Sequence, residues 1–396
     1  MDCIHRYIDT VHRPQKILKP IEKREKKNEL FKKLWGSQKQ KTPANENAYT
    51  AFWQWFQQHQ QHFHHIVNQG SKTEIERDFF DRLTPELEKV HSGIFFLTGM
   101  LTPQTAELIL TPDGIIPNIV FVEELIAAAP EIAGWKFTAL KPESDIHQVG
   151  INMHDYEFSQ ETLSFYFNQQ AEYPDEIDLV VVHDEYNAAE NDAFLQAVYI
   201  FLDNYLGEYD AVTKLDNVSV QSKQDAEKEL LPIHLLKKIL ILKSSEISRL
   251  DKITRSNTDA DEFVSLEGET NEGLPLLATL NRTLLTWDQK ASHPWMMLIE
   301  ISYDGQHSNG MPASTDYELL DLIEDALLQE LKDVDGYLNI GRETGNHLRT
   351  IYFACKEFRK PSKVIDQVIE KYKGNFEIEV SLFKDKYWRA LSKFTG

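Results

Sequence analysis

The chain has 396 residues, of which 41% are hydrophobic, and carries 42 Lys and Arg against 63 Asp and Glu, a formal net charge of −21. This composition can bury a core in two or three domains and excludes general disorder. A strongly acidic body repels phosphates, which argues against nucleic acid as a partner of the folded part. No run of eighteen apolar residues is present, so no membrane span is expected.

The charge is divided unevenly along the chain. Residues 1–45 hold 12 Lys and Arg against 5 Asp and Glu, whereas the remaining residues hold 30 against 58. We therefore predict a basic, flexible tail over residues 1–47. Charged and proline residues recur through this tail, which argues against a signal peptide. The two cysteines, Cys3 and Cys355, indicate neither a disulfide framework nor a cysteine metal site, so a cytoplasmic location is expected.

Residues 48–243 are predicted to form an α+β domain that opens with a helical hairpin. Apolar residues recur at helical spacing in two consecutive segments, which contain Phe52, Phe56, Phe63 and Ile66, and then Ile75, Phe79 and Leu83. Alternating or continuous apolar residues predict strands at 94–100, 105–111, 163–167 and 179–182, with a further strand starting at Trp135. Helices are expected at 119–129 and 194–206.

Four histidines of the first predicted helix raise the question of a metal site: His59, His62, His64 and His65. Imidazoles about one turn apart on a helix can share an ion. The flanking glutamines are typical of a solvated face, however, and no carboxylate stands at a matching turn. The sequence therefore predicts no metal site here, and no cofactor elsewhere.

The loop after the apolar strand 179–182 is the better enzyme candidate. It holds His183, Asp184 and Glu190, and active sites of open sheets gather at the carboxyl ends of central strands. The alternative is that the loop caps the next helix and is otherwise solvated. No Ser or Cys nucleophile with a suitable base can be placed beside it.

Residues 244–273 are rich in Asp, Glu, Ser, Thr and Asn without periodicity, which predicts an acidic linker. The C-terminal domain, residues 274–396, then shows the order strand, helix, strand, strand, helix, strand. The strands are expected at 295–303, 338–340, 351–355 and 376–382, and the helices at 315–332 and 361–373. Two such units predict a ferredoxin-like βαββαβ sandwich, in which both helices cover one face of a four-stranded antiparallel sheet.

The other face of this sheet is predicted to be half apolar and half acidic, with Met296, Leu298, Glu300, Tyr337, Asn339, Thr350, Tyr352, Ala354, Glu377 and Glu379. Proteins of this topology that read single-stranded RNA stack bases on sheet aromatics and attract phosphates with Lys and Arg. The three glutamates would repel phosphates instead. The pattern favours packing of Met296, Leu298 and Tyr352 against the rest of the chain, or against a protein.

The predicted hairpin of this domain carries two arginines. Arg342 lies in the segment Gly341–Gly345 and Arg349 follows it, so two guanidiniums could clamp a carboxylate or phosphate. The segment precedes a strand and lacks the Lys-Ser/Thr ending of a phosphate loop. Pairing of Arg342 with a nearby carboxylate is the alternative.

Several C-terminal motifs resemble those of a known family. They are His293-Pro294-Trp295, Asn309-Gly310-Met311-Pro312, Ile323-Glu324-Asp325, Gly341-Arg342-Glu343-Thr344, Arg349, Tyr352-Phe353 and Lys384-Asp385-Lys386-Tyr387-Trp388. The family is the bacterial domain of unknown function numbered 695. Segments 106–109, 113–114, 129–130 and 135–142 are similar to the region that often precedes that domain. The resemblance implies no activity and no catalytic residues. Some relatives are similar to, or joined with, a ferredoxin-like inhibitor of ribonuclease E, which implies an acidic protein-binding role.

The sequence thus predicts a cytoplasmic, non-enzymatic protein-binding or regulatory module. The alternative is an enzyme of unrecognised type that uses the His183–Glu190 loop or the Arg342 and Arg349 hairpin. The candidate binding residues are Arg342, Arg349, Tyr352, Glu300, His183 and Asp184. A protein partner is compatible with this prediction, and the sequence does not fix an oligomeric state.

Overall fold

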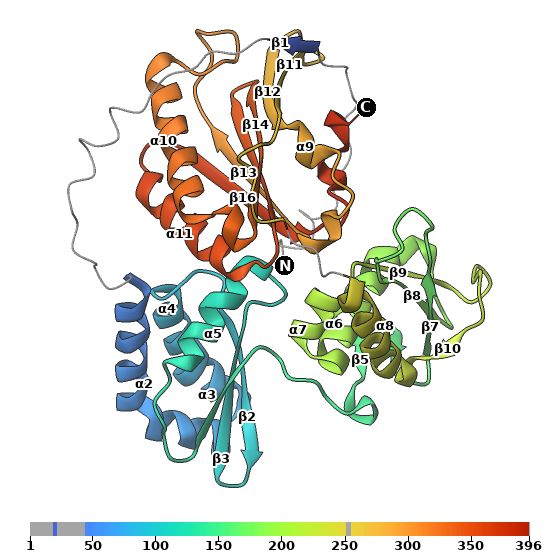
Figure 1. Ribbon diagram of the computed structural model, residues 1–396. Helices are drawn as coiled ribbons and strands as arrows, with labels where there is room; N and C mark the ends of the chain where they lie inside the picture. The colour runs from blue at the N-terminus through green and yellow to red at the C-terminus, as the bar shows by residue number, and fades with distance from the viewer. Residues whose placement is uncertain (1–18, 22–43, 251–254, 396) are drawn as a thin grey trace. The chain divides into compact units, whose positions relative to one another are not determined.

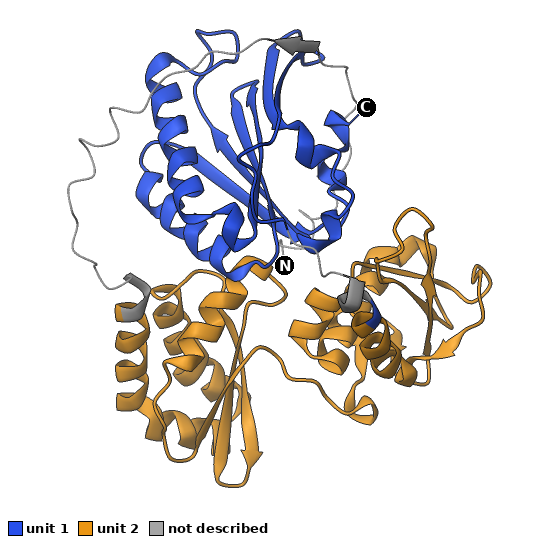
Figure 2. Ribbon diagram, viewed as in Figure 1, with its two compact units in different colours: residues 1–25, 246–396 blue, residues 26–245 orange. Residues whose placement is uncertain are grey.

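The computed structural model describes residues 19–21, 44–250 and 255–395, and it confirms an α+β protein (Figure 1). The chain divides into two compact units (Figure 2). Unit 1 comprises residues 1–25 and 246–396, and unit 2 comprises residues 26–245. Within the described ranges, every helix is too short or too polar to cross a membrane.

Unit 1 is built on an antiparallel seven-stranded sheet of order β1-β11-β12-β14-β15-β13-β16. Its strands are β1 (Lys19–Ile21), β11 (Phe263–Glu269), β12 (Pro275–Asn281), β13 (Trp295–Ser302), β14 (Tyr337–Gly345), β15 (Leu348–Cys355) and β16 (Glu377–Lys384). Its main helices are α10 (Ser314–Glu330) and α11 (Arg359–Tyr372). The four predicted strands are neighbours, and three further strands extend the sheet beyond β14.

Helices α10 and α11 cover one face of this sheet (Figure 1). Ile299 and Phe353 are fully buried. They belong to the face under the helices, because side chains alternate along a strand and Met296 and Tyr352 pack in the core on the other face. Leu320 and Ile323 of α10 are likewise fully buried. The apolar positions at helical spacing therefore form the core of unit 1 beneath its helices.

The reverse face is covered by other parts of the same unit. Met296, Tyr352 and Ala354 pack with Leu284 of α9 (Arg282–Leu285) and with Trp388, which precedes the 3-10 segment Arg389–Phe394. The Nε1 atom of Trp388 donates to the carbonyl of His293 at 3.0 Å. The apolar part of the reverse face is thus internal core. This agrees with the prediction that Met296, Leu298 and Tyr352 pack against the rest of the chain.

The face assignment of β14 was wrong. Tyr337 and Asn339 were expected on the reverse face, but Leu338 lies opposite Ala354 and joins the reverse-face core together with Ile340. The register shifts between Asn339 and Gly341, where the strand has one extra residue. Such a bulge breaks the alternation on which the assignment depended.

The predicted linker 244–273 contains regular elements, and most of the predicted tail 1–47 lies outside the described residues, which include only 19–21 and 44–47 of it. Helix α8 (Leu236–Leu250) extends into the linker range, and β11 occupies residues 263–269, where it pairs with both β12 and β1. Val264 and Leu266 of β11 pack on the reverse-face core, while Glu267 and Glu269 are exposed. Polar residues on the outer side of a half-buried strand gave this stretch the composition of a linker.

The first part of unit 2 places helices on a three-stranded sheet of order β2-β3-β4 (Figure 1). The strands are β2 (Phe95–Thr102), β3 (Thr105–Thr111) and β4 (Trp135–Ala139), and the helical segments are α2 (Ala44–Gln69), α3 (Lys72–Ile75), η2 (Glu76–Phe80), α4 (Asp81–Glu88), η3 (Ile116–Asn118) and α5 (Ile119–Ala127). Strands β2 and β3 form an antiparallel hairpin, and β4 runs parallel to β3. Aromatic residues of α2, including Phe52, Trp53 and Phe56, are buried in this core.

The second part of unit 2 has a four-stranded sheet of order β10-β7-β8-β9. Its elements are β5 (Ile151–Met153), β6 (Tyr156–Phe158), β7 (Leu163–Asn168), β8 (Asp178–His183), β9 (Asn217–Ser222), β10 (Leu231–Pro232), α6 (Asn191–Leu206), α7 (Glu208–Lys214) and α8. Every residue of β8 is buried. This agrees with the central position predicted from its apolar residues.

A buried carboxylate, Glu208, ties the loops after β3 and β4 to α7. Its side chain is fully buried and accepts hydrogen bonds from Thr111 Oγ1 at 2.7 Å, from the Gly114 amide at 2.7 Å and from the Lys141 amide at 3.0 Å. The Lys141 ammonium lies 2.6 Å from Asp113 and 3.4 Å from Asp203. Sequence reasoning missed this cluster, whose members are widely separated along the chain.

Asp203 is expected to make unit 2 less stable at neutral pH. Burial raises the pKa of Asp203 from 3.8 to about 6, and its side chain is 18% exposed. As pH rises, the carboxyl of Asp203 ionises in the unfolded chain before it ionises in the folded chain, which favours the unfolded chain. The contribution of Asp203 to the free energy of unfolding should therefore fall by up to about 3 kcal/mol between pH 4 and 6. Asp203→Asn should therefore be more stable than the wild type at pH 7 and nearly equal to it at pH 4. Urea unfolding of both proteins at pH 4, 5, 6 and 7 measures this difference, and a difference independent of pH would contradict the assignment.

Candidate functional site

The two hairpin arginines lie between the sheet of unit 1 and α10, and Arg349 is completely buried there. Its Nε donates to Thr344 Oγ1 at 3.0 Å and its Nη1 to Asp321 Oδ1 at 2.8 Å. The guanidinium carbon lies 5.1 Å from the ring centre of Tyr317. Its Nη2 atom has no hydrogen-bond partner in the part of the chain that the structure describes. Arg349 thus holds an acidic helix on the sheet.

Arg342 forms a second ion pair with the same helix. Its Nη1 lies 3.0 Å and 2.9 Å from the two carboxylate oxygens of Glu324, whose side chain is 7% exposed. The pairing with a carboxylate that the sequence left as an alternative is therefore present. Arg342 and Arg349 lie on the same face of the sheet, under α10. Each forms an ion pair with a different carboxylate of that helix.

The motif Asn309–Pro312 is fastened to the turn between β14 and β15. The Tyr303 hydroxyl donates to the Gly310 carbonyl at 3.0 Å, and the His347 amide donates to the same carbonyl at 2.9 Å. Burial raises the pKa of Tyr303 to about 12. A groove of about 870 Å³ beside this turn is lined by three carboxylates, those of Asp304, Asp316 and Glu377, and by one ammonium, that of Lys373, so the charge of its walls is negative on balance.

Tyr352 and Glu300 lie on the reverse face of the sheet. Tyr352 is 2% exposed, its hydroxyl donates to Glu343 at 3.3 Å, and the Lys393 ammonium lies 5.7 Å from its ring centre. Glu300 lies opposite Glu379 of the neighbouring strand. The C-terminal segment thus makes Tyr352 part of the core and leaves Glu300 partly exposed at its edge.

His183 is fully buried at the end of β8. Its Nδ1 accepts from the Glu185 amide at 3.0 Å and its Nε2 donates to the Glu157 carbonyl at 2.9 Å, so the neutral tautomer with hydrogen on Nε2 fits both bonds. The ring lies 4.7 Å from that of Phe158. Asp184 is half exposed and 3.6 Å from Lys223. The structure therefore separates a packed histidine from a solvated aspartate.

The histidines of α2 do not converge. His59 Nδ1 lies 2.8 Å from the Trp55 carbonyl, and His64 Nε2 lies 3.1 Å from the Gln104 carbonyl. Among the described residues, no three His, Cys, Asp or Glu side chains are arranged to hold a metal ion.

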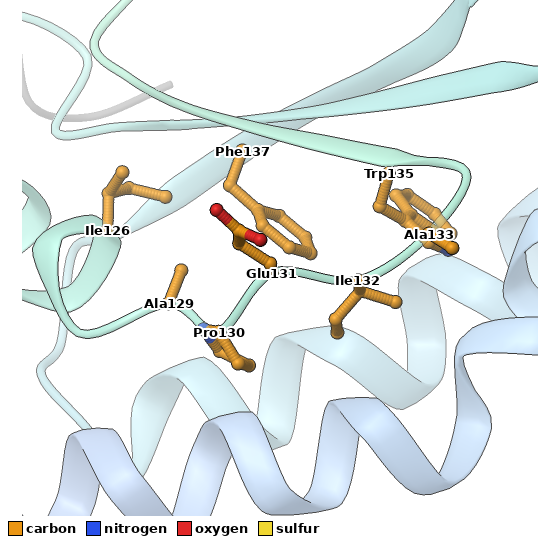
Figure 3. A pocket seen from close by; sticks show the side chains of 8 residues that line it. All are labelled: Ile126, Ala129, Pro130, Glu131, Ile132, Ala133, Trp135 and Phe137. Atoms are coloured by element: carbon orange, nitrogen blue, oxygen red, sulfur yellow. The ribbon is translucent and has the colours of Figure 1, made fainter.

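A groove at the end of α5 in unit 2 is a site that the sequence did not reveal (Figure 3). It has a volume of about 640 Å³ and is lined by Ile126, Ala129, Pro130, Glu131, Ile132, Ala133, Trp135 and Phe137. Helix α5 supplies Ile126, β4 supplies the two aromatic residues, and the connection between them supplies the rest. Glu131 is the one charged side chain of this lining, and it is exposed.

Helix α2 holds the aromatic wall of this groove in place. The rings of Trp135 and Phe137 are nearly parallel, with an interplanar angle of 4° and centres 6.1 Å apart. Trp135 Nε1 donates to the Gln60 carbonyl at 3.2 Å, and Trp53, whose ring lies 4.5 Å from Phe137, donates to the Leu125 carbonyl at 2.7 Å. The groove is therefore built before any ligand arrives.

The sequence held part of the signal for the groove. The sequence predicts a strand that starts at Trp135 and a helix that ends at residue 129. Both observations predict ordinary core equally well. Only the fold shows that the connection from residue 128 to residue 134 borders a groove that Trp135, which is 8% exposed, and the half-buried Phe137 also line.

Comparison with known proteins gives a match for part of unit 1. No curated protein and no solved structure matches the chain. The segment that matches a family model, residues 268–394, contains both hairpin arginines, the Asn309–Pro312 motif and Trp388. Residues 268–394 match the model of a family described as a family of unknown function, DUF695, as the C-terminal motifs predicted.

Proposed function

We propose that the protein is a cytoplasmic, non-enzymatic protein-binding module, and that the groove of unit 2 receives an apolar peptide segment that carries a Lys or Arg. The observation behind this proposal is the combination of a preformed aromatic wall with a single carboxylate, Glu131. A cation beside aromatic rings is attracted by the ring quadrupole, and a nearby carboxylate adds a charge-assisted hydrogen bond. Ile126 and Ile132 would receive the apolar neighbours of that cation.

The charge of the body supports a basic partner. Residues 46–396 carry 30 Lys and Arg against 58 Asp and Glu. Such an excess of negative charge raises the encounter rate with a positively charged protein and slows association with an acidic one. Glu131 would then fix the position of the partner after the encounter.

The alternative, an enzyme at the His183–Glu190 loop or at the Arg342 and Arg349 hairpin, draws less support from the geometry. His183 uses both ring nitrogens in bonds to the backbone. The two arginines are bonded to carboxylates of α10. A catalytic role would require these groups to leave their present partners.

For unit 1 we propose a ferredoxin-like sandwich formed by β13, α10, β14, β15, α11 and β16. The strand order β16-β13-β15-β14 with antiparallel neighbours supports this topology. We also propose that α2 and the helices after it form the predicted hairpin of unit 2. In this view unit 1 is a scaffold, and binding takes place on unit 2.

Site-specific photo-crosslinking tests the binding groove. A benzophenone amino acid at Ile132 should give discrete protein adducts in native lysate, whereas the same group at Lys136, on the opposite face of β4, should not. Glu131→Lys should reduce the adduct yield at Ile132 at least tenfold, because it replaces an attraction by a repulsion. Glu131→Gln should give an intermediate yield.

The sequence of the captured segment provides the decisive readout. Mass spectrometry should place the crosslink beside a Lys or Arg flanked by apolar residues. Equal adduct patterns from positions 132 and 136, or a yield that Glu131→Lys leaves unchanged, would contradict the proposed groove.

A further inference from the structure

Residues 22–43 lie outside the described ranges, directly before α2, and their sequence has the chemistry that the groove of unit 2 is proposed to accept. They hold 8 Lys and Arg against 3 Asp and Glu. All of their hydrophobic side chains fall in one stretch, where they flank Lys32 and Lys33 on both sides: Leu30, Phe31, Leu34 and Trp35. The chain therefore carries its own apolar segment with a paired lysine.

We propose that residues 30–35 occupy the groove of unit 2 in the same chain, and that an outside partner has to displace them. This inference rests on the function proposed for the groove and adds how access to it is regulated. One of the two lysines would lie beside the aromatic wall and Glu131. The apolar side chains of the segment would pack on Ile126 and Ile132.

The beginning of α2 lies next to the groove. The Tyr49 hydroxyl donates to Glu124 Oε2 at 3.2 Å, and Trp53 Nε1 donates to the Leu125 carbonyl at 2.7 Å. Glu124 and Leu125 belong to the last turn of α5 and directly precede Ile126, which lines the groove. The chain therefore enters unit 2 beside the proposed site.

The connection between the segment and α2 is long enough to reach the groove. Helix α2 begins at residue 44, and an extended chain spans up to about 30 Å from residue 35 to that point. The helix rises about 8 Å more before it reaches Tyr49, which contacts α5. A tether this short gives an effective concentration on the order of 1 mM, so a weak contact is sufficient to hold the segment in place.

Charge distinguishes this occupant from a second folded body. Helix α5 and the connection after it, residues 119–134, contain Glu123, Glu124 and Glu131 and no Lys or Arg. A basic segment is attracted to this acidic rim. A second copy of residues 46–396 would instead bring 58 Asp and Glu against 30 Lys and Arg, and would be repelled. The basic segment before α2 is therefore the occupant that the charge favours.

Photo-crosslinking in the purified full chain tests the occupant. A benzophenone amino acid at Ile132 should form adducts with residues 30–35 in a product of single-chain mass, whereas the same group at Lys136, on the opposite face of β4, should not. In a mixture of isotope-labelled and unlabelled chains, each adduct should join peptides of one isotope composition. The absence of adducts with residues 30–35, or adducts that join the two isotope compositions, would overturn the proposal.

Charge reversal within the segment tests its chemistry against a matched control. Lys32→Glu combined with Lys33→Glu should lower the yield of the internal adduct at least tenfold, because both ammonium groups become carboxylates beside Glu131. Lys39→Glu combined with Lys41→Glu makes the same change in net charge at positions without hydrophobic neighbours, and should lower the yield less than threefold. Equal losses in the two variants would show general charge attraction and overturn the proposal.

The same variants measure the regulation in native lysate. The chain with Lys32→Glu and Lys33→Glu should give at least a threefold higher yield of adducts with other proteins at Ile132, because the groove is then vacant. An unchanged yield would overturn the proposed displacement. Internal adducts without external ones would contradict the function proposed for the groove and support the internal occupant, and external adducts without internal ones would do the reverse.

Discussion

Replacing Arg349 with alanine is expected to lower the free energy of unfolding of unit 1 by about 2 to 4 kcal/mol, because a buried side chain and its hydrogen bonds are lost while its partner Asp321, 55% exposed, can be solvated. The guanidinium is fully buried, and its removal leaves a cavity and breaks the bonds to Thr344 and Asp321. Acidic helix α10 would lose one of its two cationic anchors on the sheet. Hydrogen exchange of the β14 and β15 amides in the full chain measures the loss as a lower free energy of opening.

The control for this prediction is an exposed ion pair in the same unit. Lys373 and Glu370 lie 2.6 Å apart with side chains 65% and 72% exposed, so Lys373→Ala should change stability by less than about 1 kcal/mol. Arg349→Met keeps most of the volume and should cost less than alanine. A change below about 1 kcal/mol for Arg349→Ala would show that the buried guanidinium does not hold α10.

Replacing Trp388 with alanine is expected to cost unit 1 about 3 to 5 kcal/mol as well. The indole is 2% exposed and packs in the reverse-face core with Tyr352 and Leu391. Its loss should release the segment Arg389–Phe394 and expose Met296 and Ala354 to water. Hydrogen exchange of the β13 and β15 amides, followed peptide by peptide, should show faster exchange in both strands.

Trp388→Phe separates packing from hydrogen bonding. Phenylalanine keeps an aromatic ring in the core but cannot donate to the His293 carbonyl, so the expected cost is about 1 kcal/mol for the lost bond, plus a smaller cavity cost. Equal losses for the alanine and phenylalanine variants would mean that the hydrogen bond, not the ring, fastens the segment.

The local pattern of the sequence was sufficient for the elements that have one buried face. Strand β13 and helices α10 and α11 were predicted to within two residues at each end, because their apolar positions follow a single period. Gly336 follows the 3-10 segment Asp333–Asp335 and adopts the left-handed conformation with φ 88°, which glycine reaches without strain. These are elements whose local sequence and tertiary surroundings agree.

Features that depend on residues far apart were not predictable in this way. Strand β11 was assigned to a linker because its glutamates conceal the alternation of Val264 and Leu266. The bulge between Asn339 and Gly341 put Tyr337 on the face opposite to the one predicted. The groove of unit 2 depends on the path of one connection, residues 128–134, beside Trp135 and Phe137, and no residue of that connection marks it.

The pairing of β1 with β11 gives the chain a discontinuous domain. Residues 19–21 and 263–269 are neighbours in one sheet, and the whole of unit 2 lies between them in sequence. During synthesis on a ribosome, β1 therefore cannot pair with β11 until all of unit 2 has been synthesised. A fragment that starts at residue 246 would lack β1 and leave β11 as an open edge. Expression trials of unit 1 alone should accordingly fuse residues 1–25 to residue 246 through a short linker.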